Sequence, residues 1–233
     1  MINLKKYSLI IIMIFFIALI PVSARAGGGG SGGSGSGGGS SHTHTSTSSS
    51  RAYPGTSLII WAMMAGGLYY LKRGHIHKMH KNAQKDLENA YDLDPFWNED
   101  DLKEKVKQSY YVIQEAWSQQ DLEKLKRYLS DDLYQQWQIK IEWQKYRGER
   151  NELTNIRLLS KSIISIHDDE DNTKDYFWVA IEGKMHDEII REHEIVSMNT
   201  ETFIEYWKFL RVNDVIVLDK ILQEDEVNDQ MGI

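Results

Sequence analysis

The apolar positions of residues 102–117 recur every three or four residues, which is the spacing of one face of an α-helix. This stripe consists of Leu102, Val106, Tyr110, Ile113 and Trp117. Asn98 stands before it as a candidate N-cap, and Asp121 and Asp131 are expected to begin two further helices. The last of these helices should end near Gly148. The first half of the body is therefore predicted to be helical.

The apolar period changes to two after residue 150, which is the spacing of β-strands. Strands are expected over residues 156–166, 176–190, 202–212 and 215–222. Asn213 and Asp214, between the last two, indicate a hairpin turn. Helices thus come first and antiparallel strands follow. This order predicts an α+β fold that is large enough for a core of its own.

The strand predicted over residues 202–212 carries two charged residues within an apolar row. Alternation places Phe203, Glu205, Trp207, Phe209 and Arg211 on one face of this strand. Such a face suits the wall of a curved sheet that encloses a cavity. Trp117, Trp137 and Trp178 are also expected on core faces. We therefore predict that these residues line a ligand pocket. The alternative is ordinary core packing with a Glu–Arg pair.

Composition divides the chain into two parts of opposite charge. The 233 residues carry a net charge of −7 and include no cysteine, which excludes disulfides, thiol nucleophiles and thiolate metal sites. Residues 1–84 contain eight basic and no acidic residues, and the remainder holds 19 basic and 34 acidic residues, a net charge of −15. An acidic body argues against nucleic-acid binding by charge. A basic arm joined to it indicates contact with a membrane.

The arm contains two uncharged apolar runs. Residues 7–20 follow two lysines and precede Ala24-Arg25-Ala26, the pattern of a signal peptide cleaved after Ala26; the alternative is an uncleaved anchor. Residues 27–50 are rich in Gly and Ser, which is typical of a flexible linker. Residues 56–71 have no charge and would extend about 24 Å as a helix. We expect a transmembrane helix there, with a buried core helix as the alternative.

Basic residues follow the second apolar run and set its expected orientation. Lys72, Arg73, Lys78 and Lys81 come after the run, whereas only Arg51 comes shortly before it. Positive charge stays on the cytoplasmic side, so the C-terminal body is expected in the cytoplasm. The four basic residues after the run are expected to contact anionic lipid headgroups.

Three groups of residues carry a family resemblance. They are Trp117-x3-Asp121-x3-Leu125-x3-Leu129-x3-Leu133-Tyr134, then Gly183-x3-Asp187 with Glu205-x-Trp207-x-Phe209-x-Arg211, and finally Leu218-x2-Ile221-x-Gln223. Here the body resembles the domain of the mitochondrial inner-membrane translocase subunit that tethers the import motor, and the arm is similar in layout to bacterial members of that family. The resemblance implies a cone-shaped fold like that of nuclear transport factor two, with helices packed in a curved antiparallel sheet. It also implies a role in protein transport or membrane-protein biogenesis, here at a bacterial inner membrane.

The expected organisation has six parts. A signal peptide or anchor covers residues 1–26, a linker 27–55, a transmembrane helix 56–72, a basic juxtamembrane helix 73–94, the α+β cone domain 95–226 and a tail 227–233. This layout predicts a membrane-tethered, non-enzymatic adaptor without a cofactor. Its expected partners are membrane lipids and a protein client or translocation partner, and its pocket is expected to bind lipid or peptide.

The sequence contains no motif that specifies catalysis or a metal site. His186-Asp187-Glu188 is the one local cluster of titratable residues worth testing, and Asp187 or Glu205 could serve as an acid in an apolar pocket. The alternative function is a small-molecule enzyme or ligand carrier of the ketosteroid-isomerase-like fold. Lys140 and other basic residues of the helices are interpreted as a solvated face, because acidic residues are interspersed among them.

Overall fold

The computed structural model describes residue 26 and residues 54–227, so nearly all of the predicted signal peptide, linker and tail lies outside the described residues. The helices are α2 (Pro54–Leu93), η1 (Pro95–Trp97), α3 (Glu99–Ser118), α4 (Leu122–Lys126) and α5 (Asp131–Tyr146), with short 3₁₀ turns η2 (Asn172–Lys174) and η3 (Glu224–Glu226). The strands are β1 (Glu149–His167), β2 (Tyr176–Arg191), β3 (Glu194–Asn199), β4 (Thr202–Val212) and β5 (Val215–Leu222). Helices precede an antiparallel sheet, and this confirms the predicted α+β order.

The five strands form one antiparallel sheet. The strand order is β1-β2-β4-β5, and β3 pairs with the part of β2 that extends beyond β4. β1 changes its register against β2 between Thr154 and Arg157, between Leu158 and Ser160, and between Ile163 and Ser165. Each such irregularity adds local twist to a strand and bends it. The irregularities also explain why the sequence alternation is blurred over residues 159–163.

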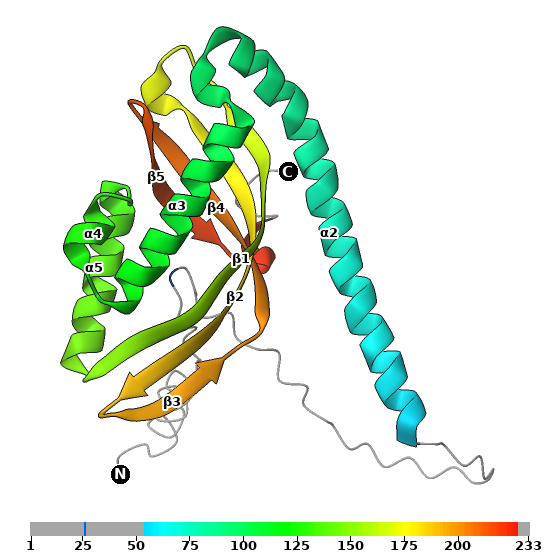
Figure 1. The fold of residues 1–233 in the computed structure, drawn as a ribbon, viewed down its shortest axis with the longest axis vertical. Helices are drawn as coiled ribbons and strands as arrows, with labels where there is room; N and C mark the ends of the chain where they lie inside the picture. Colours follow the sequence, from blue (N-terminus) through cyan, green and yellow to red (C-terminus); the bar gives the residue numbers. More distant parts are fainter. Residues whose placement is uncertain (1–25, 27–53, 228–233) are drawn as a thin grey trace, which may run out of the picture.

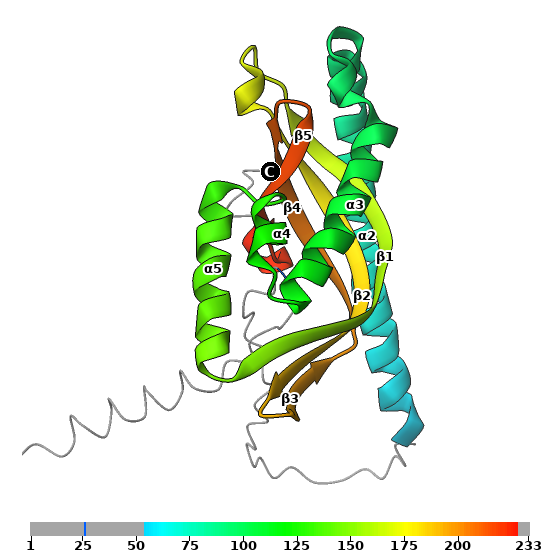
Figure 2. The same cartoon turned by 60° about the vertical axis from the view of Figure 1, so that its left-hand side comes forward.

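Helices cover both faces of the sheet (Figures 1 and 2). The inner face lies against α3, α4 and α5, and its strand residues belong to the main core: Phe177, Val179, Ile181, Phe203, Trp207 and Phe209. The outer face lies against α2, and its buried residues form a smaller cluster: Ile164, Trp178, Ala180, Tyr206 and Leu222. Met79 of α2 belongs to this outer cluster. The sheet is therefore a layer between two unequal helical coverings.

Side-chain caps fix where the inner helices begin. The side chain of Asn98 accepts a hydrogen bond from the backbone N–H of Asp101 at the start of α3. Asp121 caps α4 in the same way. α5 is capped by Ser130 instead of the expected Asp131, because the Ser130 hydroxyl accepts the N–H of Leu133. Each cap satisfies an N–H that has no partner inside its helix.

One unbroken helix contains two elements that the sequence suggested were separate. The predicted transmembrane helix (56–72) and all but the last residue of the predicted juxtamembrane helix (73–94) lie in the 40-residue α2, which ends at Leu93. Gly74 does not end it, because a helical glycine costs only about 1 kcal/mol. Within the part of the chain that the structure describes, no helix reaches both the length and the hydropathy required to cross a membrane.

Candidate functional site

Strand β4 contains the five alternating residues that were predicted to share one face, and they lie on the inner face of the sheet. Its alternate residues Phe203, Glu205, Trp207, Phe209 and Arg211 are all buried. The packing is tight at the end of this row, since a Cβ on Gly183 of β2 would lie 2.5 Å from the Phe203 ring. A side chain at position 183 would therefore displace Phe203.

The three other predicted pocket residues separate onto two faces. Trp117 and Trp137 lie in the main core, where their rings meet edge to face with centroids 4.9 Å apart. Trp178 lies in the outer cluster instead, beside Met79 of α2. Its neighbour Phe177 points inward, so strand alternation sends Trp178 outward. Trp178 thus cannot line a cavity with Trp117 and Trp137.

Glu205 is a fully buried carboxylate within the aromatic core. The indole Nε1–H of Trp207 donates to it over 3.0 Å, and the amide of Gln223 donates to it over 3.2 Å. Buried charges require such hydrogen bonds, because transfer from water is otherwise costly. The sequence analysis gave a Glu205–Arg211 pair as the alternative, but Arg211 pairs instead with Asp94 and Asp175.

Lys140 of α5 brings a positive charge to the same region. Its Nζ lies 5.0 Å from the centroid of the Trp117 ring. Burial lowers the pKa of the Lys140 ammonium, while Asp187 and Glu205 lie near enough to raise that pKa electrostatically. Asp187 is buried, whereas its neighbour His186 is exposed. Lys140 therefore belongs to a cluster of charges at the inner face, which corrects its interpretation as a fully solvated residue.

Arg211 connects the sheet to the corner after α2. Its Nη1 lies 2.5 Å from Asp94 Oδ2 and 3.1 Å from Asp175 Oδ2, and its guanidinium stands over the Phe96 ring. The backbone N–H of Phe96 and, to a smaller extent, Arg211 hold the pKa of the Asp94 carboxyl below its usual range. These contacts account for the buried guanidinium and give Arg211 a role in fixing the corner.

Of the four basic residues predicted to contact lipid, two form ion pairs with the body of the protein. Lys72 Nζ lies 2.5 Å from Glu224 Oε2, and Arg73 Nη2 lies 3.2 Å from Glu182 Oε2. Both pairs hold α2 against the acidic body. Lys78 and Lys81 are exposed on α2. Lys72 and Arg73 are exposed as well, so the four residues differ in their ion pairs and not in whether they are exposed.

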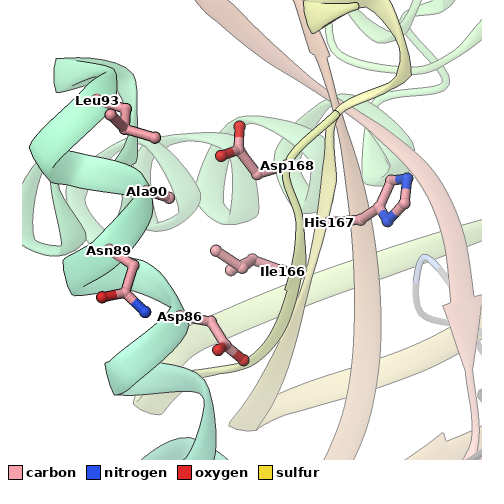
Figure 3. A pocket seen from close by; sticks show the side chains of 7 residues that line it. All are labelled: Asp86, Asn89, Ala90, Leu93, Ile166, His167 and Asp168. Atoms are coloured by element: carbon pink, nitrogen blue, oxygen red, sulfur yellow. The ribbon is translucent and has the colours of Figure 1, made fainter. Parts of the chain in front are cut away.

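Among the surface pockets that described residues form, three have volumes of about 290, 330 and 360 Å³, and the lining of these three does not include the predicted pocket residues. One pocket has a volume of about 330 Å³ and lies between the end of α2 and β1, as Figure 3 shows. Its lining consists of Asp86, Asn89, Ala90, Leu93, Ile166, His167 and Asp168. Despite this mixture of carboxylates and imidazole, no cluster of metal-ligating side chains is found among the residues that the structure describes.

Sequence reasoning missed two exposed apolar features. Ile139, Trp143 and Tyr146 of α5 line an open pocket of about 290 Å³. Their spacing of four and three residues is a helical stripe that the sequence contained. The second feature is strand β3, which carries exposed apolar side chains and was not predicted at all.

Comparison with known proteins supports a family assignment. The profile of the Tim44-like domain matches residues 83–221, more than half of the chain. No curated protein shows a significant match. The intermembrane-space region of the chloroplast protein ARC6 is a similar solved structure, with 12% sequence identity and a TM-score of 0.40 over 52% of this chain and 95% of that one.

Proposed function

Because the chain belongs to the Tim44-like domain family, we propose that it is a membrane-tethered, non-enzymatic adaptor in protein transport or membrane-protein biogenesis. This family includes membrane-associated adaptors of protein transport. The family domain, residues 83–221, begins inside α2 and ends in β5. It therefore includes the inner helices, nearly all of the sheet and the last turns of α2, whereas Met79 and the polar contacts of α2 lie before it.

The observation that carries the proposal is the continuity of α2. Its first residues include the uncharged run 56–71, and its later residues pack on the outer face of the sheet. At about 1.5 Å per residue, 40 residues extend about 60 Å. The predicted membrane segment and the domain thus share one stiff element. In this arrangement the domain has a defined orientation relative to the bilayer.

The contacts of α2 with the sheet place the domain immediately beside the end of the apolar run. The Tyr69 hydroxyl donates to Glu182 over 2.5 Å, and Lys72 and Arg73 pair with carboxylates of the body. We propose that residues before Tyr69 enter the bilayer while residues after it hold the body at the surface. The flanking basic residues favour the cytoplasmic side of a bacterial inner membrane.

Alkaline carbonate extraction of membranes that contain the full chain tests the tether. The unaltered chain is expected to stay in the membrane pellet, because a spanning helix is not released by high pH. Ile59→Lys with Ile60→Lys should shift it to the supernatant, since each lysine near a span centre costs about 3 kcal/mol. Val215→Lys, on an exposed hairpin of the body, is the control and should stay in the pellet. Release of the unaltered chain would contradict the proposal.

A second candidate function is supported by the charges at the inner face. Lys140 lies over the ring of Trp117, and Asp187 and Glu205 lie near enough to Lys140 to act on it electrostatically. This arrangement suits a carrier of an apolar ligand with one polar group. Asp187→Asn and Glu205→Gln would then abolish the thermal stabilisation produced by such a ligand while membrane association persists. Lipid-induced stabilisation that is unchanged in both variants would exclude this candidate.

A further inference from the structure

Strand β3 presents an unpaired edge of the sheet. All six of its residues are exposed, and within the described part of the chain it pairs only with β2. Glu192 and His193, at the turn before it, have positive φ angles of 49° and 74°, which is the geometry of a tight hairpin turn. The edge of a strand offers backbone N–H and C=O groups to any further strand that approaches it.

The side chains of β3 are unusually apolar for an exposed edge. Ile195, Val196 and Met198 have exposed fractions of 54%, 48% and 57%. Proteins commonly protect such an edge with lysine, proline or a covering loop, and none of β3's own residues is lysine or proline. An apolar edge that keeps its backbone groups available is typical of a surface that binds another strand.

The charge around β3 is negative. Residues 188–201 contain four acidic residues and one arginine, a net charge of −3. The arginine, Arg191, is already paired with Glu149, to which its Nε donates over 2.8 Å. The acidic residues Glu192, Glu194 and Glu201 flank the apolar side chains and are exposed. The edge is therefore complementary to an apolar segment that also carries basic residues.

We propose that the β3 edge binds an extended segment of a partner protein, with apolar and basic side chains, which adds to the sheet as a further strand. The inference rests on the proposed adaptor function and names the surface that receives the partner. The β2–β3 hairpin lies at the same end of the molecule as the start of α2 (Figures 1 and 2). A partner bound there would lie close to the membrane end of the tether.

Charge argues against the two other occupants of such an edge. An anionic lipid surface would repel Glu192, Glu194 and Glu201. A second copy of the chain, paired antiparallel to the first, would bring the acidic turn of one copy next to Glu201 of the other. A basic, extended segment meets neither obstacle.

Peptide binding to the purified full chain in detergent micelles tests this inference. The probe is a fluorescent peptide of alternating Lys and Val, and its anisotropy should rise on binding. Ile195→Ser with Met198→Ser should weaken the affinity at least about tenfold, because two buried apolar contacts are lost. Glu192→Lys with Glu194→Lys should abolish binding. Val215→Ser, at a residue of 58% exposure on the other hairpin, is the matched control and should leave the affinity unchanged.

Two altered peptides test whether binding requires backbone hydrogen bonds and whether it requires basic side chains. The same peptide N-methylated on every backbone amide should not bind, since it cannot donate hydrogen bonds to a strand. A peptide of alternating Glu and Val should not bind either. Equal binding of the N-methylated peptide would overturn strand addition, and equal binding of the acidic peptide would overturn charge recognition.

Other outcomes would assign the edge to a different occupant and overturn the proposal. One is a dimer in light scattering that Ile195→Ser converts to a monomer. Another is binding of the body to anionic vesicles that Ile195→Ser abolishes. The carbonate test of the tether is independent of β3, so a chain that stays in the membrane but binds no Lys–Val peptide contradicts only the inference about this edge.

Discussion

The inner and outer faces of the sheet are covered in different ways. On the inner face, three helices bury aromatic side chains completely, as at Trp117, Trp207 and Phe209. On the outer face a single helix, α2, buries a small cluster around Met79 and Trp178. The polar contacts of α2 with the body are partly exposed, as in the pair formed by Lys72. The inner helices are part of the main core, whereas α2 is attached to the outer face of the sheet through a smaller cluster.

This difference implies that stability decreases along α2 toward its beginning. The last turns of α2 join the main core through Leu87 and Ala90, and Arg211 fixes the corner that follows. The first described contacts are polar: Tyr69 donates to the buried carboxylate of Glu182, and Lys72 forms an exposed pair with Glu224. Exposed pairs contribute little to stability because water and salt screen them. The domain should therefore fold without the beginning of α2, and α2 should detach from that end first.

The largest loss of stability is expected from a substitution in the main core, on the inner face of the sheet. Trp207→Ala should lower the free energy of unfolding by about 4 kcal/mol, because it removes a fully buried indole and a donor to Glu205. Urea denaturation measures this loss. Trp143→Ala, at a residue that is 60% exposed, is the control and should change stability by less than about 0.5 kcal/mol. Similar losses in the two variants would contradict the assignment of the core.

The corner after α2 should be the next most sensitive. Arg211→Met leaves the buried carboxylate of Asp175 without its counter-ion and should cost about 3 kcal/mol in urea denaturation. Lys220→Met, on the exposed surface of β5, should cost almost nothing. If both substitutions were neutral, the guanidinium would have no role in holding the corner.

Acid should weaken the same corner. The Asp94 carboxyl has a folded pKa below its usual value, so it contributes stability above its unfolded pKa of about 3.9 and loses that contribution as pH falls through the folded value. The contribution of this carboxyl to the free energy of unfolding should therefore decrease as the pH falls below about 4. Arg211→Met should make that slope shallower without removing it, because the Phe96 N–H remains. An identical slope in both proteins would contradict the coupling.

Detachment of α2 from the outer face should be separable from unfolding of the main core. Met79→Ala removes the main α2 contribution to the outer cluster and should cost about 2 kcal/mol. Hydrogen exchange should then accelerate in α2 while the strand amides of the inner face keep their protection. Uniform acceleration throughout the domain would show that the two coverings are one cooperative unit.

The smallest effect is expected at the exposed pair of Lys72 and Glu224. Lys72→Ala should reduce the stability of the docked arm by about 0.5 kcal/mol at low salt and by nothing measurable at 1 M salt. Lys78→Ala, on the same helix, should show no such salt dependence. A loss from Lys72→Ala that persists at high salt would indicate a contact other than a screened ion pair.

Local patterns predicted the elements of the body well. Alternation over residues 202–212 placed the row from Phe203 to Arg211 on one face, and the cap at Asn98 marked the start of α3. Trp178 was misplaced because its strand is apolar on both faces, so periodicity does not say which face is inner. β3 was missed because all its residues are exposed and it has no alternation to detect. The partners of Arg211 and the inward position of Lys140 depend on residues distant in the chain, which no local pattern encodes.

Thiol labelling across the membrane tests most directly whether α2 joins a membrane segment to the domain. The chain contains no cysteine, so Ile60→Cys and Tyr91→Cys each introduce a single thiol, near the start and near the end of α2. We expect an impermeant maleimide to label Tyr91→Cys in inside-out vesicles and not in intact cells, and to label Ile60→Cys in neither until detergent is added. Labelling of Ile60→Cys in intact membranes, or of Tyr91→Cys from outside the cell, would contradict the account.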